Sequence, residues 1–151
     1  METLCIKSSV GDLTLFEDGG NIIALDWGQG FDTGRTSDNP VLNQAAQALH
    51  DYFQSGADNF KSLPLDPGGT DFQRRVWTEI QKIKPGQVKT YGEIARALSS
   101  SPRAVGNACG ANPIPILIPC HRVVAQNSLG GYTGDGGLDT KTQLLRLEGY
   151  L

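Results

Sequence analysis

The chain has 151 residues, enough for one typical domain or two small ones, and its 38% hydrophobic content suffices for a buried core. No apolar stretch approaches the roughly 18 residues that a membrane span needs, and the first residues lack the basic and apolar regions of a secretory signal. We therefore expect neither a membrane span nor a secretory signal, and the sequence predicts a cytoplasmic protein.

The three cysteines, Cys5, Cys109 and Cys120, are an odd and sparse set, which indicates a reducing compartment and no disulfide framework. The chain has two histidines, His50 and His121, and no Cys-x-x-Cys pair. A structural zinc site is therefore not expected, and neither is a cofactor.

The formal net charge of −3 conceals an uneven distribution. Residues 1–70 contain three Lys/Arg and ten Asp/Glu and carry −7, whereas residues 71–151 contain ten and six and carry +4. Unless the charges cluster by chance, this asymmetry indicates that only the second half meets a polyanion.

The first 30 residues have the composition of a β-meander. Residues 13–16 and 22–25 are rich in β-forming side chains, and the Asp18-Gly19-Gly20-Asn21 segment between them has the composition of a hairpin turn. The Gly/Asp/Ser/Thr-rich residues 28–39 are expected to form a loop.

Apolar residues recur at helical spacing from Val41 to Phe53, with Pro40 suited to the first turn and Gly56 following the end. Residues 62–69 contain two prolines and two glycines, and the charge balance changes sign there. We therefore expect the linker between two domains at this segment.

Two capping boxes, Thr70–Gln73 and Thr90–Glu93, predict helix starts in the second half. The first helix should carry its apolar residues on one face, namely Phe72, Val76, Trp77, Ile80 and Ile83. The second should end at Leu98, and a last helix should occupy residues 139–148, before Gly149.

Ser99 and Ser100 should form a turn, after which Ser101 caps a helix that begins at Pro102 and ends near Gly110. Two short helices joined by a tight turn form a helix-turn-helix, which often places its second helix against DNA. Many helical domains contain such a pair, so the spacing alone is weak evidence for DNA binding.

Cys120 and His121 follow the apolar run Ile114–Ile118. A thiol with an imidazole partner can act as a nucleophile, because the partner favours the thiolate. Adjacent side chains usually point apart, so a bridging water or a local turn would have to connect them. The alternative is a buried structural cysteine at the end of a strand.

Five segments resemble the O6-alkylguanine-DNA alkyltransferase family, in the same order. They are FQRRVW (Phe72–Trp77), TYGEIA (Thr90–Ala95), NPIPILIPCHRVV (Asn112–Val124), GGYTG (Gly130–Gly134) and LLRLEG (Leu144–Gly149). The resemblance is dense over residues 72–149 and limited to the general layout in the first 66.

The resemblance implies an α+β protein with a small N-terminal RNase H-like α/β domain, residues 1–66. Residues 67–151 should form a helical winged-helix/helix-turn-helix domain that binds DNA. The implied partner is double-stranded DNA containing O6-alkylguanine, bound by a monomer without an obligate protein partner.

The resemblance also implies a mechanism of direct-reversal repair. The alkylated guanine is flipped out of the duplex, because chemistry on a stacked base is sterically blocked. Cys120 then takes the alkyl group once, while His121 accepts the thiol proton through a water and Glu148 orients the imidazole. Glu148 lies near a helix C-terminus, where an acidic side chain is otherwise unfavourable.

By the same resemblance, Tyr91 contacts the flipped purine, Arg103 fills the gap left in the stack, and Asn112 ties the recognition helix to the active-site segment. The remaining candidates are Thr90, Ala104 and Asn107 for DNA, and Val123 (through its carbonyl), Tyr132 and Thr133 for the pocket.

The chain departs from the family pattern in three places. The turn between Tyr91 and Arg103 is about two residues shorter than in many members, and the segment 134–140 about two longer. Asn107 and Gly110 occupy recognition-helix positions where a small and often a basic residue is usual. Cys5 does not recreate the zinc site of some relatives.

Three other functions compete with alkyl transfer. Non-enzymatic alkyltransferase-like proteins bind the lesion but carry tryptophan in place of Cys120. A transcriptional regulator would need base-reading side chains, of which the recognition helix offers only Arg103. A thiol hydrolase would need an oxyanion hole, which the sequence does not reveal.

Overall fold

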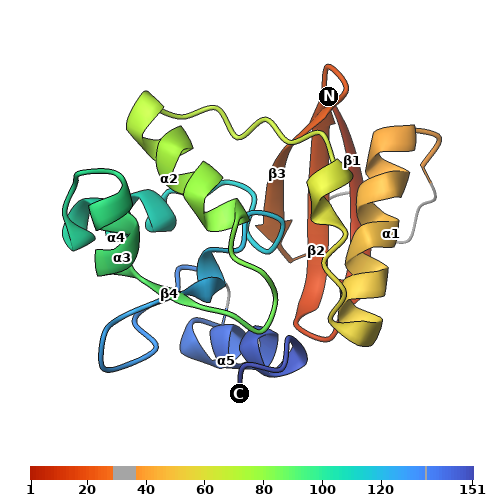
Figure 1. The fold of residues 1–151 in the computed structure, drawn as a ribbon. Helices are drawn as coiled ribbons and strands as arrows, with labels where there is room; N and C mark the ends of the chain where they lie inside the picture. Colours follow the sequence, from red (N-terminus) through yellow and green to blue (C-terminus); the bar gives the residue numbers. More distant parts are fainter. Residues whose placement is uncertain (29–36, 135) are drawn as a thin grey trace. The chain divides into compact units, whose positions relative to one another are not determined.

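The computed structural model describes residues 1–28, 37–134 and 136–151, which divide into two compact units, residues 1–67 and 68–151 (Figure 1). The first unit combines a sheet with one long helix, and the second is mainly helical. The α+β class expected from the sequence is confirmed. Each unit is considered separately below.

The sheet of the first unit is the expected meander, with strands β1 (Glu2–Ser8), β2 (Gly11–Asp18) and β3 (Asn21–Trp27) in antiparallel order. Asp18 pairs with Asn21 across Gly19 and Gly20, whose φ angles of 60° and 88° match the left-handed conformation of a two-residue hairpin turn.

Helix α1 (Pro40–Ser55) lies along this sheet (Figure 1). The Asn39 side chain accepts hydrogen bonds from the first free amides of the helix, and Gly56 ends it at a φ of 76°. A short 3₁₀ helix (Phe60–Ser62) follows. The loop expected at residues 28–39 lies mostly outside the described residues.

The second unit contains helices α2 (Asp71–Gln81), α3 (Tyr91–Ala97), α4 (Pro102–Gly110) and α5 (Leu138–Leu147). A 3₁₀ turn (Cys120–Arg122) leads into β5 (Val123–Val124), which pairs in parallel with β4 (Lys89–Thr90).

Both expected capping boxes are present in the second unit, at Thr70 and Thr90, and Ser101 caps α4. The expectation for α2 was wrong in one detail. Ile83 is buried but lies beyond the helix, because Lys82 is already the C-cap. The last helix begins one residue earlier than expected and ends at Leu147, with Glu148 as its cap.

The apolar run before Cys120 is not a strand, so the interpretation of Cys120 as a structural cysteine at a strand end is wrong. The amides of Leu117 and Ile118 donate to the carbonyls of Pro115 and Ile114, which closes a compact turn. Prolines lack the amide that a strand ladder needs, and here Pro113 and Pro119 flank the segment while Pro115 lies within it. Ile116 lies at a φ of 72°, a strained conformation for a β-branched residue.

Candidate active site

Cys120 lies at the start of the 3₁₀ turn and is 6% exposed. Its amide donates to the Ile118 carbonyl at 2.8 Å, so the compact turn sets the direction of the backbone at the nucleophile. The side chain lines a cavity of about 360 Å³.

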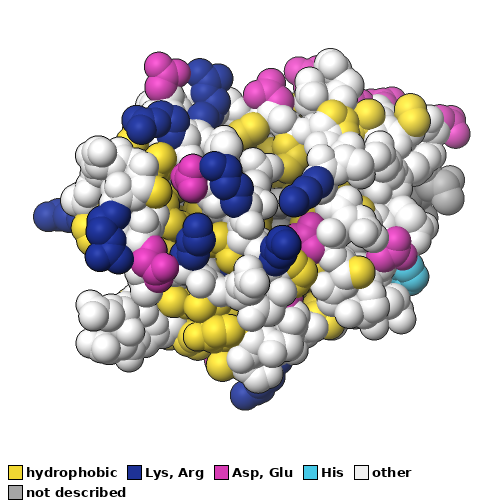
Figure 2. Space-filling model, in the orientation of Figure 1, with side chains coloured by type: hydrophobic (Ala, Val, Ile, Leu, Met, Phe, Trp, Pro, Cys, Tyr) yellow, Lys and Arg dark blue, Asp and Glu magenta, His cyan; other side chains and the backbone are white. Residues whose placement is uncertain are grey.

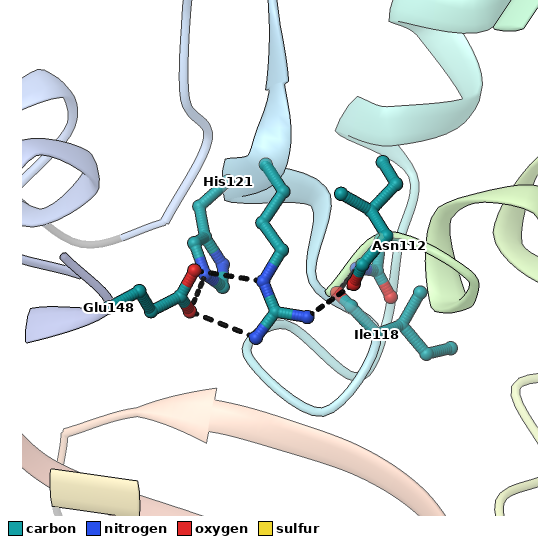
Figure 3. Close-up of polar contacts among 6 residues, drawn as sticks. Asn112, Ile118, His121 and Glu148 are labelled. Atoms are coloured by element: carbon teal, nitrogen blue, oxygen red, sulfur yellow. Dashed lines mark hydrogen bonds and ion pairs between the residues drawn. The ribbon is translucent and has the colours of Figure 1, made fainter. Parts of the chain in front are cut away.

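The next two residues, His121 and Arg122, are fully buried and both contact Glu148 (Figure 3). His121 Nε2 lies 2.6 Å from Glu148 Oε2. Arg122 donates Nε to Glu148 Oε1 at 2.9 Å and Nη2 to Oε2 at 3.0 Å, while its Nη1 donates to the Ile83 carbonyl at 2.7 Å. Arg122 therefore holds the carboxylate from one side and His121 from the other.

This geometry decides the charges. Burial alone would raise the pKa of Glu148, but the hydrogen bonds from His121 and Arg122 outweigh it and lower the pKa to about 2. Burial lowers the pKa of His121, although Glu148 opposes the shift. At neutral pH the carboxylate is thus ionised and the imidazole neutral.

A neutral His121 donates its Nε2 proton to Glu148, which leaves Nδ1 as an acceptor. Within the described part of the chain, Nδ1 is buried without a hydrogen-bond partner. The imidazole can therefore accept a proton at Nδ1 while Glu148 stabilises the resulting cation.

Burial raises the pKa of the Cys120 thiol, whereas a hydrogen bond from Asn112 and the charge of Lys141 lower it. The thiol consequently remains protonated at rest, and its reaction as a nucleophile needs a base.

Asn112 joins the segment after α4 to the turn before Cys120. Its Nδ2 donates to the carbonyl of Ile118, which lies beside it in Figure 3, at 2.8 Å. Its Oδ1 accepts from the Ile114 amide at 2.9 Å. The asparagine thereby replaces the backbone partners that a strand would have supplied.

Two tyrosines from separate segments, Tyr91 and Tyr132, also line the cavity beside Cys120. Its walls are Tyr91, Gly106, Cys109, Gly110, Cys120, Gly131, Tyr132 and Thr133. Burial and the nearby thiols raise the pKa of Tyr91 to about 12, and burial raises that of Tyr132, so both remain protonated and can donate hydrogen bonds.

The expected DNA-contacting residues lie at the helix pair. Arg103 and Asn107 are exposed one helical turn apart on α4, and Ala104 is half-buried between them. The Thr90 side chain is used as the cap of α3. Figure 2 shows several Lys and Arg side chains over the region where Figure 1 draws α2, α3 and α4.

Helix α4 is fixed from inside the unit by Trp77 of α2. The indole Nε1 donates to the Ala108 carbonyl at 2.9 Å, and Val105, Ala108 and Cys109 are buried. The exposed face of α4 is therefore the side opposite this contact.

Sequence reasoning missed two buried cations, Arg122 and Lys141. Lys141 donates from Nζ to the Val123 carbonyl at 2.7 Å, the same carbonyl that was assigned to the pocket. A signal existed for the lysine, because it occupies the apolar spacing of α5, three residues before Leu144. For Arg122 the only signal was a charge adjoining an apolar run.

Among the described residues, no cluster of three or more His, Cys, Asp or Glu side chains could hold a metal ion. No helix in the described part of the chain is long and apolar enough to cross a membrane.

Two family models match most of the chain: the 6-O-methylguanine DNA methyltransferase ribonuclease-like domain over residues 3–67 and the DNA-binding domain of the same family over residues 71–150. A methylated-DNA--protein-cysteine methyltransferase of Metallosphaera sedula is 41% identical over 95% of this chain and 90% of its own. The corresponding Haemophilus influenzae protein is 37% identical over 93% and 82%.

Among solved structures, Mycobacterium tuberculosis OGT in complex with DNA superposes with a TM-score of 0.82 at 39% identity, covering 97% of this chain and 91% of that one. A Methanococcus jannaschii O6-methylguanine DNA methyltransferase gives 0.71 at 31% identity, covering 96% and 92%. The family models match both parts of the chain, and the relatives are similar over nearly their whole length. This chain therefore belongs to the 6-O-methylguanine DNA methyltransferase family.

Proposed function

We propose that the chain repairs DNA directly by moving an alkyl group from O6 of guanine to Cys120. One observation carries this proposal: Cys120 lines a cavity, and the next residue, His121, forms a buried pair with Glu148. Relatives named methylated-DNA--protein-cysteine methyltransferases support the same reaction.

The reaction begins when the Cys120 thiol loses its proton to His121 Nδ1 through a bridging water. Sγ then attacks the alkyl carbon, a C–S bond forms, and the bond between that carbon and O6 breaks with its electron pair going to the guanine. Tyr91, protonated at neutral pH, donates a hydrogen bond to the departing base. Glu148 stabilises the imidazolium.

The product is a thioether on Cys120. A thioether is a poor leaving group, so the acceptor is not regenerated and each molecule acts once. The count of repaired bases therefore cannot exceed the count of protein molecules.

The damaged base reaches the cavity by flipping from the duplex, with α4 as the DNA-facing helix. Arg103 supplies the planar group that fills the gap, while Asn107, Ala104 and the start of α3 at Thr90 lie against the backbone. The exposure of Arg103 and Asn107 supports this assignment.

We propose further that residues 1–66 and 67–151 are the two domains and that a monomer acts in the cytoplasm. The compact units 1–67 and 68–151 differ from this division by one residue and support it. Three free cysteines suit a reducing compartment. Light scattering after gel filtration, with and without DNA, would reveal any dimer.

The decisive experiment is mass spectrometry after mixing the protein with duplex DNA containing O6-methylguanine. We expect one added methyl group, on the peptide carrying Cys120, and a plateau at one repaired base per protein. Methylation elsewhere, or continued turnover with excess lesion, would overturn the proposal. An alkyltransferase-like sensor, a regulator and a hydrolase would each leave Cys120 unmodified.

A further inference from the structure

Lys141 is a fully buried ammonium that the mechanism above does not use. It lies on α5 at a position that faces the core, between the buried residues Thr140 and Leu144. Its Nζ donates to the Val123 carbonyl at 2.7 Å and to the Gly131 carbonyl at 3.0 Å.

These two carbonyls belong to segments on either side of the cavity. Val123 follows the Cys120–Arg122 turn directly, and Gly131 is itself a cavity wall, next to Tyr132. One ammonium therefore joins the segment carrying the nucleophile to the wall carrying a phenol. Nothing else described in the second unit bridges these two carbonyls.

An apolar residue could fill the same core position without the desolvation penalty of a buried charge. Burial lowers the pKa of Lys141 to about 8, and the Cys120 and Cys109 thiols oppose that shift. The ammonium is thus charged at neutral pH. Burial of that charge is unfavourable unless an anion forms nearby.

Among the described residues around the active site, the other buried charges are already compensated. Arg122 and Glu148 form a bidentate pair, and His121 is neutral at rest. The remaining groups that titrate around the cavity are the Cys109 thiol and the phenols of Tyr91 and Tyr132, all with a raised pKa and therefore neutral. Within the described part of the second unit, Lys141 is the buried cation without an anionic partner, and it interacts electrostatically with Cys120.

Resting on the proposed function, we propose that Lys141 is a positioning residue of the transfer reaction: it fixes the two cavity walls through Val123 and Gly131, and its charge stabilises the thiolate that forms at Cys120. Lys141 thus has two roles, a geometric one through its hydrogen bonds and an electrostatic one through its charge. The two can be separated by substitution.

Lys141→Gln keeps amide donors for the two carbonyls but removes the charge, whereas Lys141→Arg keeps both. The exposed Lys84→Gln is the matched control. In the full-length protein, the rate at which iodoacetamide modifies Cys120 should be followed against pH by mass spectrometry. This readout needs no DNA lesion, so it remains informative if the proposed function fails.

We expect Lys141→Gln to raise the pH midpoint of Cys120 modification by about one unit and to slow methyl transfer at pH 7 about tenfold. Lys141→Arg should have a pH midpoint close to that of the unaltered chain, and Lys84→Gln should have the same midpoint as the unaltered chain. A folded Lys141→Gln protein with an unchanged midpoint would overturn the electrostatic role.

Should Lys141→Gln not fold, reciprocity offers a second measurement, because two groups that interact must shift each other equally. The titration of the Lys141 ammonium can be followed by NMR after Cys120 is modified with iodoacetate, which leaves a carboxylate on Sγ, and after it is modified with iodoacetamide, which leaves a neutral amide. The carboxylate should raise the Lys141 midpoint relative to the amide, and an identical midpoint in the two proteins would refute the coupling.

Discussion

His121 and Arg122 share one carboxylate, that of Glu148. Glu148 Oε2 is within hydrogen-bond distance of both His121 Nε2 and Arg122 Nη2, while Oε1 is held by Arg122 Nε. Arginine presents a rigid fork that fixes the plane of a carboxylate, which a lysine could not do. The imidazole is therefore oriented by a carboxylate that is itself immobilised, which suits the proposed role of its Nδ1 as the base.

Acid should destabilise the fold through this cluster. The folded-state pKa of Glu148 is about 2 against an unperturbed 4.5, so its contribution is present above pH 4.5 and is lost as pH falls toward 2. That difference corresponds to about 3 kcal/mol. His121, whose pKa is lowered by burial, adds a loss that begins near its unperturbed pKa of 6.5.

The measurement is the free energy of unfolding in urea at pH 7, 5 and 3. The control is Asp71→Asn, which changes an exposed carboxylate and should leave the pH dependence intact. An unfolding free energy that stays constant from pH 5 to 3 would contradict the charge assignment of Glu148.

Only one of the two thiols in the cavity should accept the alkyl group. We expect Cys120→Ser to abolish transfer and to leave DNA binding largely intact, because sulfur supplies the nucleophile and the helices supply the affinity. Burial raises the pKa of Cys109 to about 12, so it remains a thiol, and Cys109→Ala should change the rate by less than about twofold.

Transfer rates in duplex DNA and band-shift affinities would test both variants, with Cys5→Ala as a further control. A large drop in transfer by a folded Cys109→Ala protein would mean that the second thiol takes part in the chemistry.

At the scale of the elements, the cavity depends on how closely the segment after β5 approaches α3. A Cβ added to Gly130 would lie 3.0 Å from Tyr91 Cε2 and 3.1 Å from its hydroxyl, and the φ of 76° is itself unfavourable for alanine. We expect Gly130→Ala to displace the phenol and to slow reaction with free O6-benzylguanine roughly tenfold or more.

Gly92→Ala is the matched control, because its Cβ would meet only Thr90 Oγ1 at 3.8 Å. Free O6-benzylguanine is the appropriate substrate, since it reports on the cavity without DNA binding. Equal rates for the two variants would show that Tyr91 tolerates the closer contact.

Helix α4 should contribute to base flipping through Arg103. A guanidinium is planar and can stack in the gap that an extruded base leaves, whereas a phosphate contact would add affinity alone. We expect Arg103→Ala to slow duplex repair at least about tenfold and to change the reaction with free O6-benzylguanine little, with partial rescue by lysine.

Arg146→Ala removes another exposed arginine, on α5, and should affect neither rate. If Arg103→Ala reduced both reactions by the same factor, another side chain would have to fill the gap.

At the scale of the whole molecule, features governed by local chemistry were predictable. The hairpin at Gly19-Gly20 and the caps at Thr70 and Thr90 follow from interactions within four residues. The proposed trio of Cys120, His121 and Glu148 was suggested by motifs and not by spacing, because Glu148 contacts His121 across 27 positions.

Other features were beyond local reasoning because distant segments create them. The turn at 114–118 depends on Asn112 satisfying the Ile118 carbonyl in place of a neighbouring strand. Arg122 and Lys141 are buried only because remote carbonyls, those of Ile83, Val123 and Gly131, accept their protons. A charged residue at an apolar position is the one sequence sign of such an arrangement.

The charge asymmetry between the two halves bears on DNA affinity. Residues 1–70 carry −7 and residues 71–151 carry +4, so counterion release on DNA binding should come from the second half alone. Lys89 precedes α3, the first helix of the pair, and the exposed Arg96 lies in the last turn of that helix. The first half offers Lys7 and Lys61 as exposed lysines for comparison.

We expect the double variant Lys89→Gln/Arg96→Gln to weaken binding and to reduce the slope of log K against log salt by about one for each phosphate that the protein no longer neutralises. The double variant Lys7→Gln/Lys61→Gln changes the net charge equally and should leave the slope unchanged. Fluorescence anisotropy with a duplex at several salt concentrations measures both slopes. Equal reductions would mean that affinity follows the overall charge of the molecule, and the assignment of DNA binding to the helix pair would then lack its electrostatic support.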